Sequence, residues 1–241
     1  STVDGPVTVV DHTHTFNENN TCPCGLSCNH QNVTNGTCDS CGTAFAAKVG
    51  ETYYQDVGTA LARAEENQTV RLLRNAVLDR SVTVQKDITL IVDAFRLSGS
   101  GEIQISGNVT LNSAKNGRID VPLRLTDGTL ILQNAFLGTI STLTVESGAM
   151  LQSDGAFSGR VEELRISENG GAELSGGSFG AIRCSDGQFT AKKLLPDGYA
   201  FYDTNTHAAV PCSTRISRDD LLQLQNVAVD VCGHTAIDAY G

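Results

Sequence analysis

The residues best suited to chemistry gather near the start of the chain, where five of the eight cysteines and three of the five histidines lie between positions 12 and 41. They are His12, His14, Cys22, Cys24, Cys28, His30, Cys38 and Cys41. The order reads as one motif written twice: Cys or His, any residue, His, a seven-residue polar loop, and a Cys pair followed by Gly. Thiolate and imidazole are the ligands that Zn²⁺ prefers, so the pattern predicts metal binding.

Each copy of the motif offers four ligands, which predicts one or two Zn²⁺ ions in this segment. Four protein ligands leave no open position for water or substrate, so the predicted role of the metal is structural. Cys38 and Cys41 have the usual spacing of a zinc-binding pair, whereas Cys22 and Cys24 are one residue short of it. A cluster of disulfides is the alternative for a secreted chain, although it does not explain why histidines recur at a fixed offset from the cysteines.

Composition excludes some classes of partner. The 241 residues contain 17 Lys and Arg against 27 Asp and Glu, a net charge of −10, which argues against binding to nucleic acid or to an anionic membrane surface. The longest apolar runs, such as residues 88–92, are far shorter than the roughly 18 residues of a membrane helix, so no membrane insertion is expected.

The segments that would carry this metal motif follow it in the chain. Residues 48–54 are typical of a strand pair or turn, and apolar residues at helical spacing predict a helix over 56–66, with Asp56 as its N-cap. Short alternating segments then begin at Val70, Ile88, Val109, Leu130, Met150 and Glu173, at separations of 18, 21, 21, 20 and 23 residues. A repeat of about twenty residues predicts an all-β chain, a right-handed parallel β-helix whose open end the helix caps. A β-sandwich is the alternative.

Three domains are expected: a Cys/His-rich zinc-binding head at 1–47, the β-helix at 48–203, and a closing segment at 204–241. The stretch 194–203 breaks the period and is expected to close the far end of the coils. A helix is predicted near 217–224, and Cys184 and Cys212 are candidates for a disulfide. Cys232, Gly233 and His234 repeat the first half of the metal motif, so we expect the chain to be one period of a longer array, with adjacent repeats as partners.

The order of these motifs resembles a known architecture. The Cys-x-His and Cys-x-x-Cys-Gly motifs are followed in order by "AKVGETYYQDVGTALARAEENQTVRLL", "LSGGSF" and "LLPDGYAFYD". In these motifs and their order, the chain resembles the repeat units of large cell-surface proteins of gut Firmicutes. The chain departs from that pattern at Cys22-Pro-Cys24 and in His12 standing for Cys. The resemblance implies right-handed β-helices joined by Cys/His heads, an extracellular location on the bacterial surface or in secreted form, and an adhesin-like role with a host immunoglobulin or mucin as partner.

Acidic and basic residues in the turns of the coils raise the possibility of an enzyme, because β-helix lyases and hydrolases place such groups on one face. The candidates are Asp120, Asp127, Glu146, Asp154 and Glu162, near Arg118, Arg124, Arg160 and Arg165. Asp is common in turns in any case, which favours a solvated rim. We therefore expect a non-catalytic binding module, with a carbohydrate-active β-helix enzyme as the alternative.

Overall fold

The computed structural model describes residues 28–113, 115–133, 136–185, 194–201 and 208–211. The chain forms two compact units, Ser1–Phe45 and Ala46–Gly241. The predicted ligands His12, His14, Cys22 and Cys24 lie outside the described residues, as do Cys212, the predicted helix near 217–224 and the motif at 232–234. Within the described part, no helix has the length and apolar character that crossing a membrane requires.

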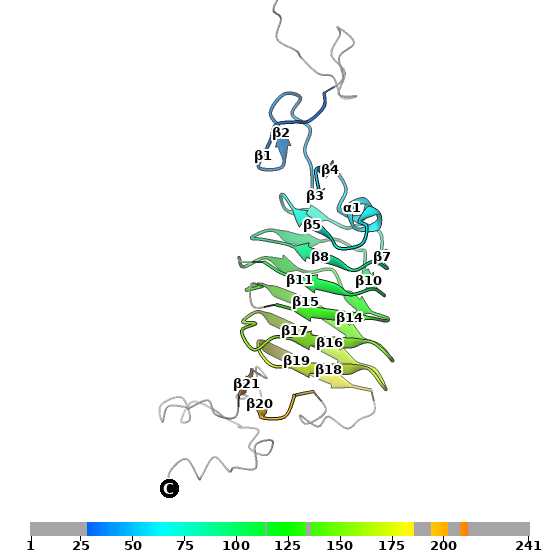
Figure 1. Cartoon of the computed structure of the whole chain (residues 1–241), viewed down its shortest axis with the longest axis vertical. Coiled ribbons are helices and arrows are strands. Elements are labelled where there is room, and N and C mark those ends of the chain that lie inside the picture. The colour runs from blue at the N-terminus through cyan, green and yellow to red at the C-terminus, as the bar shows by residue number, and fades with distance from the viewer. Residues whose placement is uncertain (1–27, 114, 134–135, 186–193, 202–207, 212–241) are drawn as a thin grey trace, which may run out of the picture. The chain divides into compact units, whose positions relative to one another are not determined.

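Two sheets of mainly parallel strands form the second unit (Figure 1). The first sheet has eight strands among the described residues, in the order β18 (Gly171–Leu174), β16 (Met150–Ser153), β14 (Thr129–Leu132), β11 (Val109–Leu111), β8 (Ile88–Ile91), β5 (Gln68–Leu72), β3 (Ala47–Val49) and β4 (Thr52–Tyr54). From β5 to β18 all neighbours are parallel, whereas β3 and β4 form the antiparallel pair that residues 48–54 predict.

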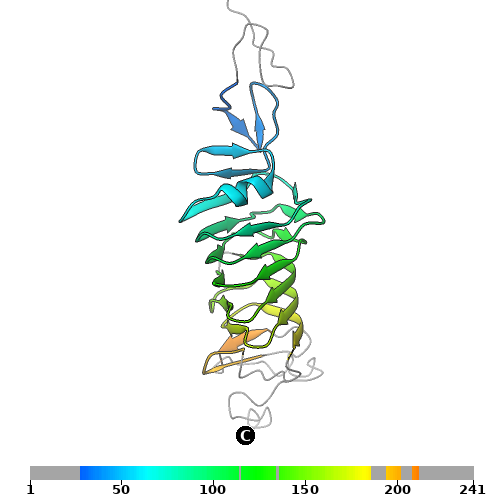
Figure 2. The ribbon, with the colours of Figure 1, turned by 90° about the vertical axis from the view of Figure 1, so that its right-hand side faces the viewer.

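The second sheet has nine strands in the same described ranges. They run in the order β6 (Ala76–Val77), β9 (Arg96–Ser98), β12 (Arg118–Ile119), β15 (Thr139–Val145), β13 (Leu123–Leu125), β10 (Ile103–Ile105) and β7 (Val82–Val84), with β17 (Arg160–Ile166) beside β15 and β19 (Ser178–Cys184) beside β17. The early coils divide this sheet into two short strands each, and the seven-residue β15 pairs with both β12 and β13. From β15 onward each coil crosses the sheet in one strand (Figure 2).

This arrangement is a parallel β-solenoid, which confirms the predicted fold and excludes the β-sandwich. The period is more regular than the sequence suggests: Ile88 stacks on Gln68, 20 residues earlier, and each later step to Val109, Leu130, Leu151 and Ala172 is 21 residues. Inward side chains alternate with outward ones along most strands, and equivalent apolar residues stack from coil to coil and form one continuous core. The seven-residue strands β15, β17 and β19 break the strict alternation.

Three of the predicted segment starts were out of register. Val70 stacks on Leu90 rather than on Ile88, and Met150 stacks on Thr129 rather than on Leu130. Met150 is half-exposed and Glu173 is exposed, so both point outward, whereas the neighbouring Leu151 is fully buried. A shift of one residue in register moves a side chain to the opposite face of a strand. Because Met150 is apolar, the sequence alone did not reveal that Met150 faces outward and Leu151 inward.

The helix that caps the first coil is α1 (Val57–Arg63). Asp56 is its N-cap, and its Oδ1 accepts hydrogen bonds from the amide and the hydroxyl of Thr59, as the sequence predicts. Val57, Ala60 and Leu61 are buried against β3, β5 and β7, which covers the apolar end of the core. The helix ends at Arg63, three residues before the predicted end, because Ala64 adopts an extended backbone conformation.

At the other end of the solenoid, β20 (Tyr199–Phe201) pairs antiparallel with β21 (Ala209–Pro211). Leu194, Leu195 and Phe201 are buried in the same core as the coils. The amide of Leu174 in the last described strand of the first sheet donates to the carbonyl of Leu194 at 2.8 Å. Residues 194–201 therefore close this end, as expected, and β21 joins them from beyond the predicted limit at residue 203.

Candidate metal centre

The described part of the first unit, residues 28–45, is built on a tight hairpin. Strands β1 (Val33–Thr34) and β2 (Thr37–Cys38) are joined by Asn35 and Gly36, which both have positive φ values, at 50° and 73°. Two central residues with positive φ are the requirement of a type I′ turn, and Asn-Gly is its most frequent sequence. This dipeptide is the sequence signal for the hairpin, but the pattern of ligands alone did not identify it.

The hairpin continues directly into the second Cys pair. Gly42 has a φ of +74°, and its amide donates to the carbonyl of Cys38 at 2.8 Å, which closes a turn around Cys38 and Cys41. The amide of Cys38 donates in turn to the carbonyl of Thr43 at 2.8 Å. Cys28 and His30 come from the segment before β1, and His30 also has a positive φ of 54°. The turn and this segment bring two ligand pairs to one point.

Cys28, His30, Cys38 and Cys41 form one group whose ligand atoms all lie within 4.8 Å of one another. The Sγ atoms of Cys28 and Cys38 are 3.5 Å apart, and Cys41 Sγ is 3.4 Å from His30 Nδ1. Cys38 is buried, and the other three side chains are half-buried. The imidazole of His30 stands edge-on to Phe45, with a distance of 5.0 Å between ring centroids.

The dimensions of this group suit a tetrahedral metal ion. Bond lengths of about 2.3 Å to sulfur and 2.0 Å to nitrogen imply ligand separations of roughly 3.5–3.8 Å in a tetrahedron. The Cys28–Cys38 and Cys41–His30 separations agree with that range within a few tenths of an ångström. Three thiolates and one imidazole are a Cys₃His donor set, which selects a soft or borderline ion over Mg²⁺ or Ca²⁺.

The thiols of this centre differ in acidity when no metal is bound. Burial raises the pKa of Cys28 to about 11, and the neighbouring Cys38 and Cys41 thiols add to the rise. Burial also acts to raise the pKa of Cys41, but hydrogen bonds from the side chain and backbone of Thr43 outweigh it and lower the value to about 6. A metal must therefore displace a proton from Cys28 at neutral pH, and metal affinity is expected to rise with pH.

The structure thus brings together four of the eight predicted ligands, those of the second copy of the motif. Their positions follow from the turn chemistry at Asn35, Gly36 and Gly42, all of which have positive φ. Thr43 was missed by the sequence reasoning, although its hydroxyl lies 3.1 Å from Cys41 Sγ. Its position two residues after a Cys ligand is the only signal that the sequence offers.

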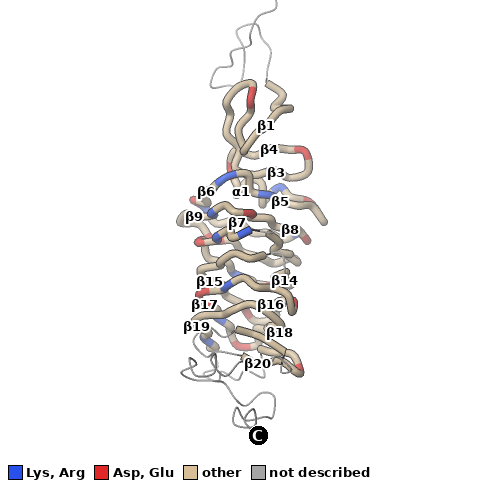
Figure 3. The backbone as a smooth tube through the Cα atoms, turned by 90° about the vertical axis from the view of Figure 1, so that its left-hand side faces the viewer, with Lys and Arg blue, Asp and Glu red and all other residues tan. Residues whose placement is uncertain are grey.

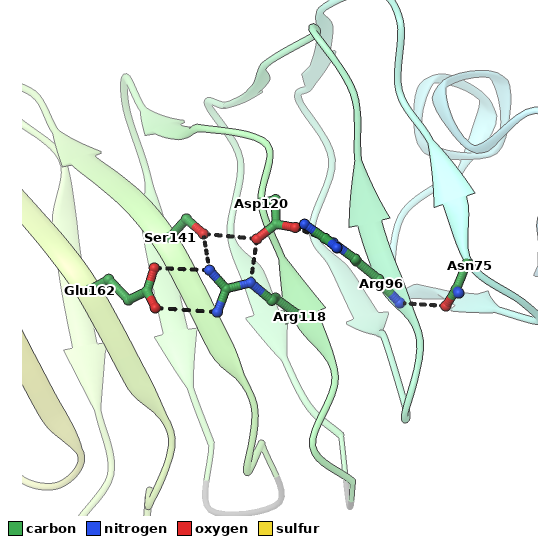
Figure 4. Close-up of polar contacts among 6 residues, drawn as sticks. All are labelled: Asn75, Arg96, Arg118, Asp120, Ser141 and Glu162. Atoms are coloured by element: carbon green, nitrogen blue, oxygen red, sulfur yellow. Dashed lines mark hydrogen bonds and ion pairs between the residues drawn. The ribbon is translucent and has the colours of Figure 1, made fainter.

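Acidic and basic residues recur along the coils (Figure 3). Several of the predicted candidates pair with one another: Arg118 with Asp120 and Glu162 (Figure 4), and Arg124 with Glu146. The guanidinium of Arg118 donates to both carboxylate oxygens of Glu162, two coils away, at 3.0 and 3.2 Å. It also donates to Asp120 and to the hydroxyl of Ser141. Arg96, which the sequence reasoning missed, forms an ion pair with the other oxygen of Asp120.

Further ion pairs connect other coils of the same sheet. Arg124 pairs with Glu146 at 2.5 Å, and Arg165 and Arg183 share Glu163 at 3.0 Å each. Glu163 and Arg183 were also missed. The signal was present, because the partners in three of these ion pairs, Arg96–Asp120, Arg124–Glu146 and Arg183–Glu163, are separated by 20 to 24 residues, about one period.

The three remaining candidates are Asp127, Asp154 and Arg160. Asp127 accepts a hydrogen bond from the amide of Gly128 within its own turn, and Asp154 does so from Ala156. Arg160 forms no ion pair with any residue that the structure describes. Most of the candidate residues that the structure describes therefore lie in ion pairs between side chains of the coils or in hydrogen bonds within a single turn.

The ion pairs affect what the carboxylates can do chemically. Burial opposes ionisation of Asp120, but hydrogen bonds from Arg96, Ser141 and Arg118 lower its pKa below the ordinary value. The pKa of Glu163 is also lowered, by hydrogen bonds from Arg165 and Arg183. A general acid or base for neutral pH needs a pKa near 7, so these shifts run in the wrong direction for that role.

Comparison with protein families, with curated proteins and with solved structures found no match to this chain.

Proposed function

We propose that this chain is a non-catalytic, extracellular binding module of a bacterial surface protein, with a small head stabilised by structural Zn²⁺. The observation that carries the proposal is the contrast between the two groups of candidate residues. The Cys₃His group has the donor set and dimensions of a closed metal site, and the carboxylates of Asp120 and Glu162 in the coils are paired with arginines. Both arrangements contribute to stability rather than to turnover.

Zinc is the ion that the head fits best. Cys₃His is a common donor set of structural zinc sites, in which all four positions belong to the protein. The described ligands account for one ion, and His12, His14, Cys22 and Cys24 would supply a second by the same motif. The described part of the head contains a hairpin whose two strands have two residues each, and few buried apolar side chains. The free energy of metal binding would therefore contribute much of the folding free energy of the head.

The coils provide the surface for a partner. Along the centre of the first sheet, outward residues of six successive coils form one row: Thr69, Thr89, Thr110, Ile131, Gln152 and Glu173. Most of these side chains are uncharged, and parallel strands hold them in fixed register. A rigid surface of this kind loses little conformational entropy on binding. The resemblance to repeat units of bacterial cell-surface proteins implies a host mucosal protein, immunoglobulin or mucin, as the partner, together with adjacent repeats of the same kind.

The binding part of this proposal can be tested with the purified chain over immobilised immunoglobulin and over immobilised mucin, with biolayer interferometry as the readout. We expect binding to at least one surface. A Cys38→Ser variant, which removes a buried ligand from the head but leaves the coils intact, is expected to bind equally well if the coils carry the interaction. Binding to neither protein would contradict this choice of partner.

The same preparation distinguishes the enzyme alternative when it is incubated with a panel of acidic and neutral glycans. We expect no new reducing ends or unsaturated products. Cleavage that disappears in Asp120→Asn or Glu162→Gln would replace the binding module with a carbohydrate-active enzyme.

Elemental analysis and thiol titration test the metal part. We expect one or two zinc ions per chain and free thiols after metal removal. Absence of metal together with fully oxidised cysteines would show that the head is a disulfide cluster instead.

A further inference from the structure

We propose that Thr43 is a positioning residue of the metal centre, whose hydroxyl donates a hydrogen bond to the sulfur of Cys41 and thereby strengthens metal binding. The inference rests on the proposed metal site. It assigns a role to a residue that is not a ligand and that the pattern of Cys and His does not include.

The position of Thr43 is fixed on both sides by backbone contacts. Its carbonyl accepts a hydrogen bond from the amide of Cys38 at 2.8 Å, and its neighbour Ala44 forms a β-bridge with Thr37. These contacts join residue 43 to the strand that carries Cys38. The Oγ1 atom of Thr43 then lies 3.1 Å from Cys41 Sγ, within hydrogen-bonding distance for sulfur.

The direction of this hydrogen bond follows from the chemistry of a metal ligand. Cysteine binds a metal as the thiolate, which has no proton to donate, so the hydroxyl must be the donor. Three thiolates and a neutral imidazole around a divalent ion leave a formal charge of −1 on the centre. Because Cys38 is buried and the other ligands are half-buried, a donor that draws electron density from one sulfur stabilises that charge. Groups that orient and polarise metal ligands in this way typically change affinity 10-fold to 100-fold.

The head also contains a matched control. Thr34 lies in the same hairpin, and its hydroxyl donates to Asp39 Oδ2 at 3.0 Å rather than to a ligand. Replacing either threonine by valine removes one hydroxyl and retains the branched side chain. Thr43→Val therefore tests the bond to sulfur, whereas Thr34→Val tests the general cost of losing a hydroxyl from this hairpin.

The experiment uses the full chain, stripped of metal and titrated first with Co²⁺ and then with Zn²⁺ in competition. For Thr43→Val we expect Zn²⁺ affinity to fall about 10-fold to 100-fold. The thiolate-to-Co²⁺ charge-transfer band should move to lower energy, because a sulfur without its hydrogen bond holds its electrons less tightly. Thr43→Ser should keep the Zn²⁺ affinity and the band energy of the unsubstituted chain, and Thr34→Val should change neither of them.

The outcomes separate this inference from the metal site itself. Unchanged affinity and an unchanged band in Thr43→Val would overturn the role of Thr43 and leave the site intact. Failure of the unsubstituted chain to bind Co²⁺ or Zn²⁺ would instead contradict the proposed site. If Thr43→Val does not fold, Thr43→Ser and Thr43→Ala decide the question, because they differ by one hydroxyl; equal affinities for that pair would overturn the inference.

Discussion

At the scale of a single residue, Asp120 connects side chains of three coils. Its carboxylate accepts hydrogen bonds from Arg118 on its own coil and from Ser141 on the next coil, and it pairs with Arg96 of the coil before. Side chains on three successive coils therefore meet at one group (Figure 4). Each exposed ion pair contributes little by itself, but a network that shares one half-buried carboxylate contributes more.

Protonation of Asp120 is expected to reduce the stability of the coils. Its pKa is lowered on folding, so its contribution is present above the ordinary value of about 3.9 and is lost as pH falls through the folded value. Asp120→Asn should therefore be less stable than the unsubstituted chain at about pH 7, and the difference should narrow toward about pH 2. Urea unfolding at several pH values measures the free energy of unfolding of both proteins and hence the difference between them at each pH.

Asp127→Asn is the control for this prediction, because the carboxylate of Asp127 accepts a hydrogen bond from the amide of Gly128 in its own turn. At neutral pH, Asp127→Asn should lower the free energy of unfolding by less than Asp120→Asn does. If the free energies of unfolding of Asp120→Asn and the unsubstituted chain differ by the same amount across the whole pH range, the charge of the carboxylate does not stabilise the fold.

The corners of the coils show what sets the period at the scale of elements. Gly117, Gly138 and Gly159 follow one another at steps of 21 residues. A Cβ atom on Gly138 would lie 2.1 Å from the carbonyl oxygen of Gly117, so at this corner the coils approach more closely than any side chain allows. The sequence reasoning assigned glycine to turns that need positive φ. That role is correct for Gly148, which has a φ of +86°, but Gly138 serves the close approach of two backbones.

The two kinds of glycine predict different costs. Gly138→Ala should lower the free energy of unfolding by about 3 kcal/mol, because the backbone of the neighbouring coil must move. Gly148→Ala, where a Cβ meets nothing within 4 Å, should cost about 1 kcal/mol of backbone strain only. Urea unfolding of both variants gives the comparison, and equal costs would show that the corner adjusts freely.

The division into two units has a consequence at the scale of the whole molecule. The solenoid has a continuous apolar core of its own, whereas the described part of the head has the Cys₃His group and few buried side chains. The two units should therefore depend on metal to different extents.

Removal of metal with a chelator should unfold the head and leave the coils folded. Hydrogen exchange is the measurement: amides of residues 28–45 should lose protection, and those of residues 68–174 should keep it. The Cys38→Ser variant should resemble the chelated protein and show no further response to chelator. Retained protection in the head would contradict a structural metal, and lost protection in the coils would contradict independent units.

The sequence by itself determined the class of fold and the identity of the candidate metal ligands. Apolar residues recurring at about 21-residue steps can be buried together only if successive coils stack, and Cys and His at fixed offsets have few other uses. It also predicted α1 and its cap at Asp56, because capping depends on residues adjacent in the chain.

Register, side-chain pairing and close approach were decided by the tertiary structure. Whether Met150 or Leu151 faces the core depends on which residue of the previous coil lies opposite, and the local sequence does not contain that information. The partners of Arg118, the closeness of Gly138 to Gly117 and the contact of Thr43 with Cys41 are likewise properties of segments brought together by folding. Residues adjacent in the chain determine which helices and strands form, and the stacking of one coil on the next determines which side chains and backbone atoms come into contact.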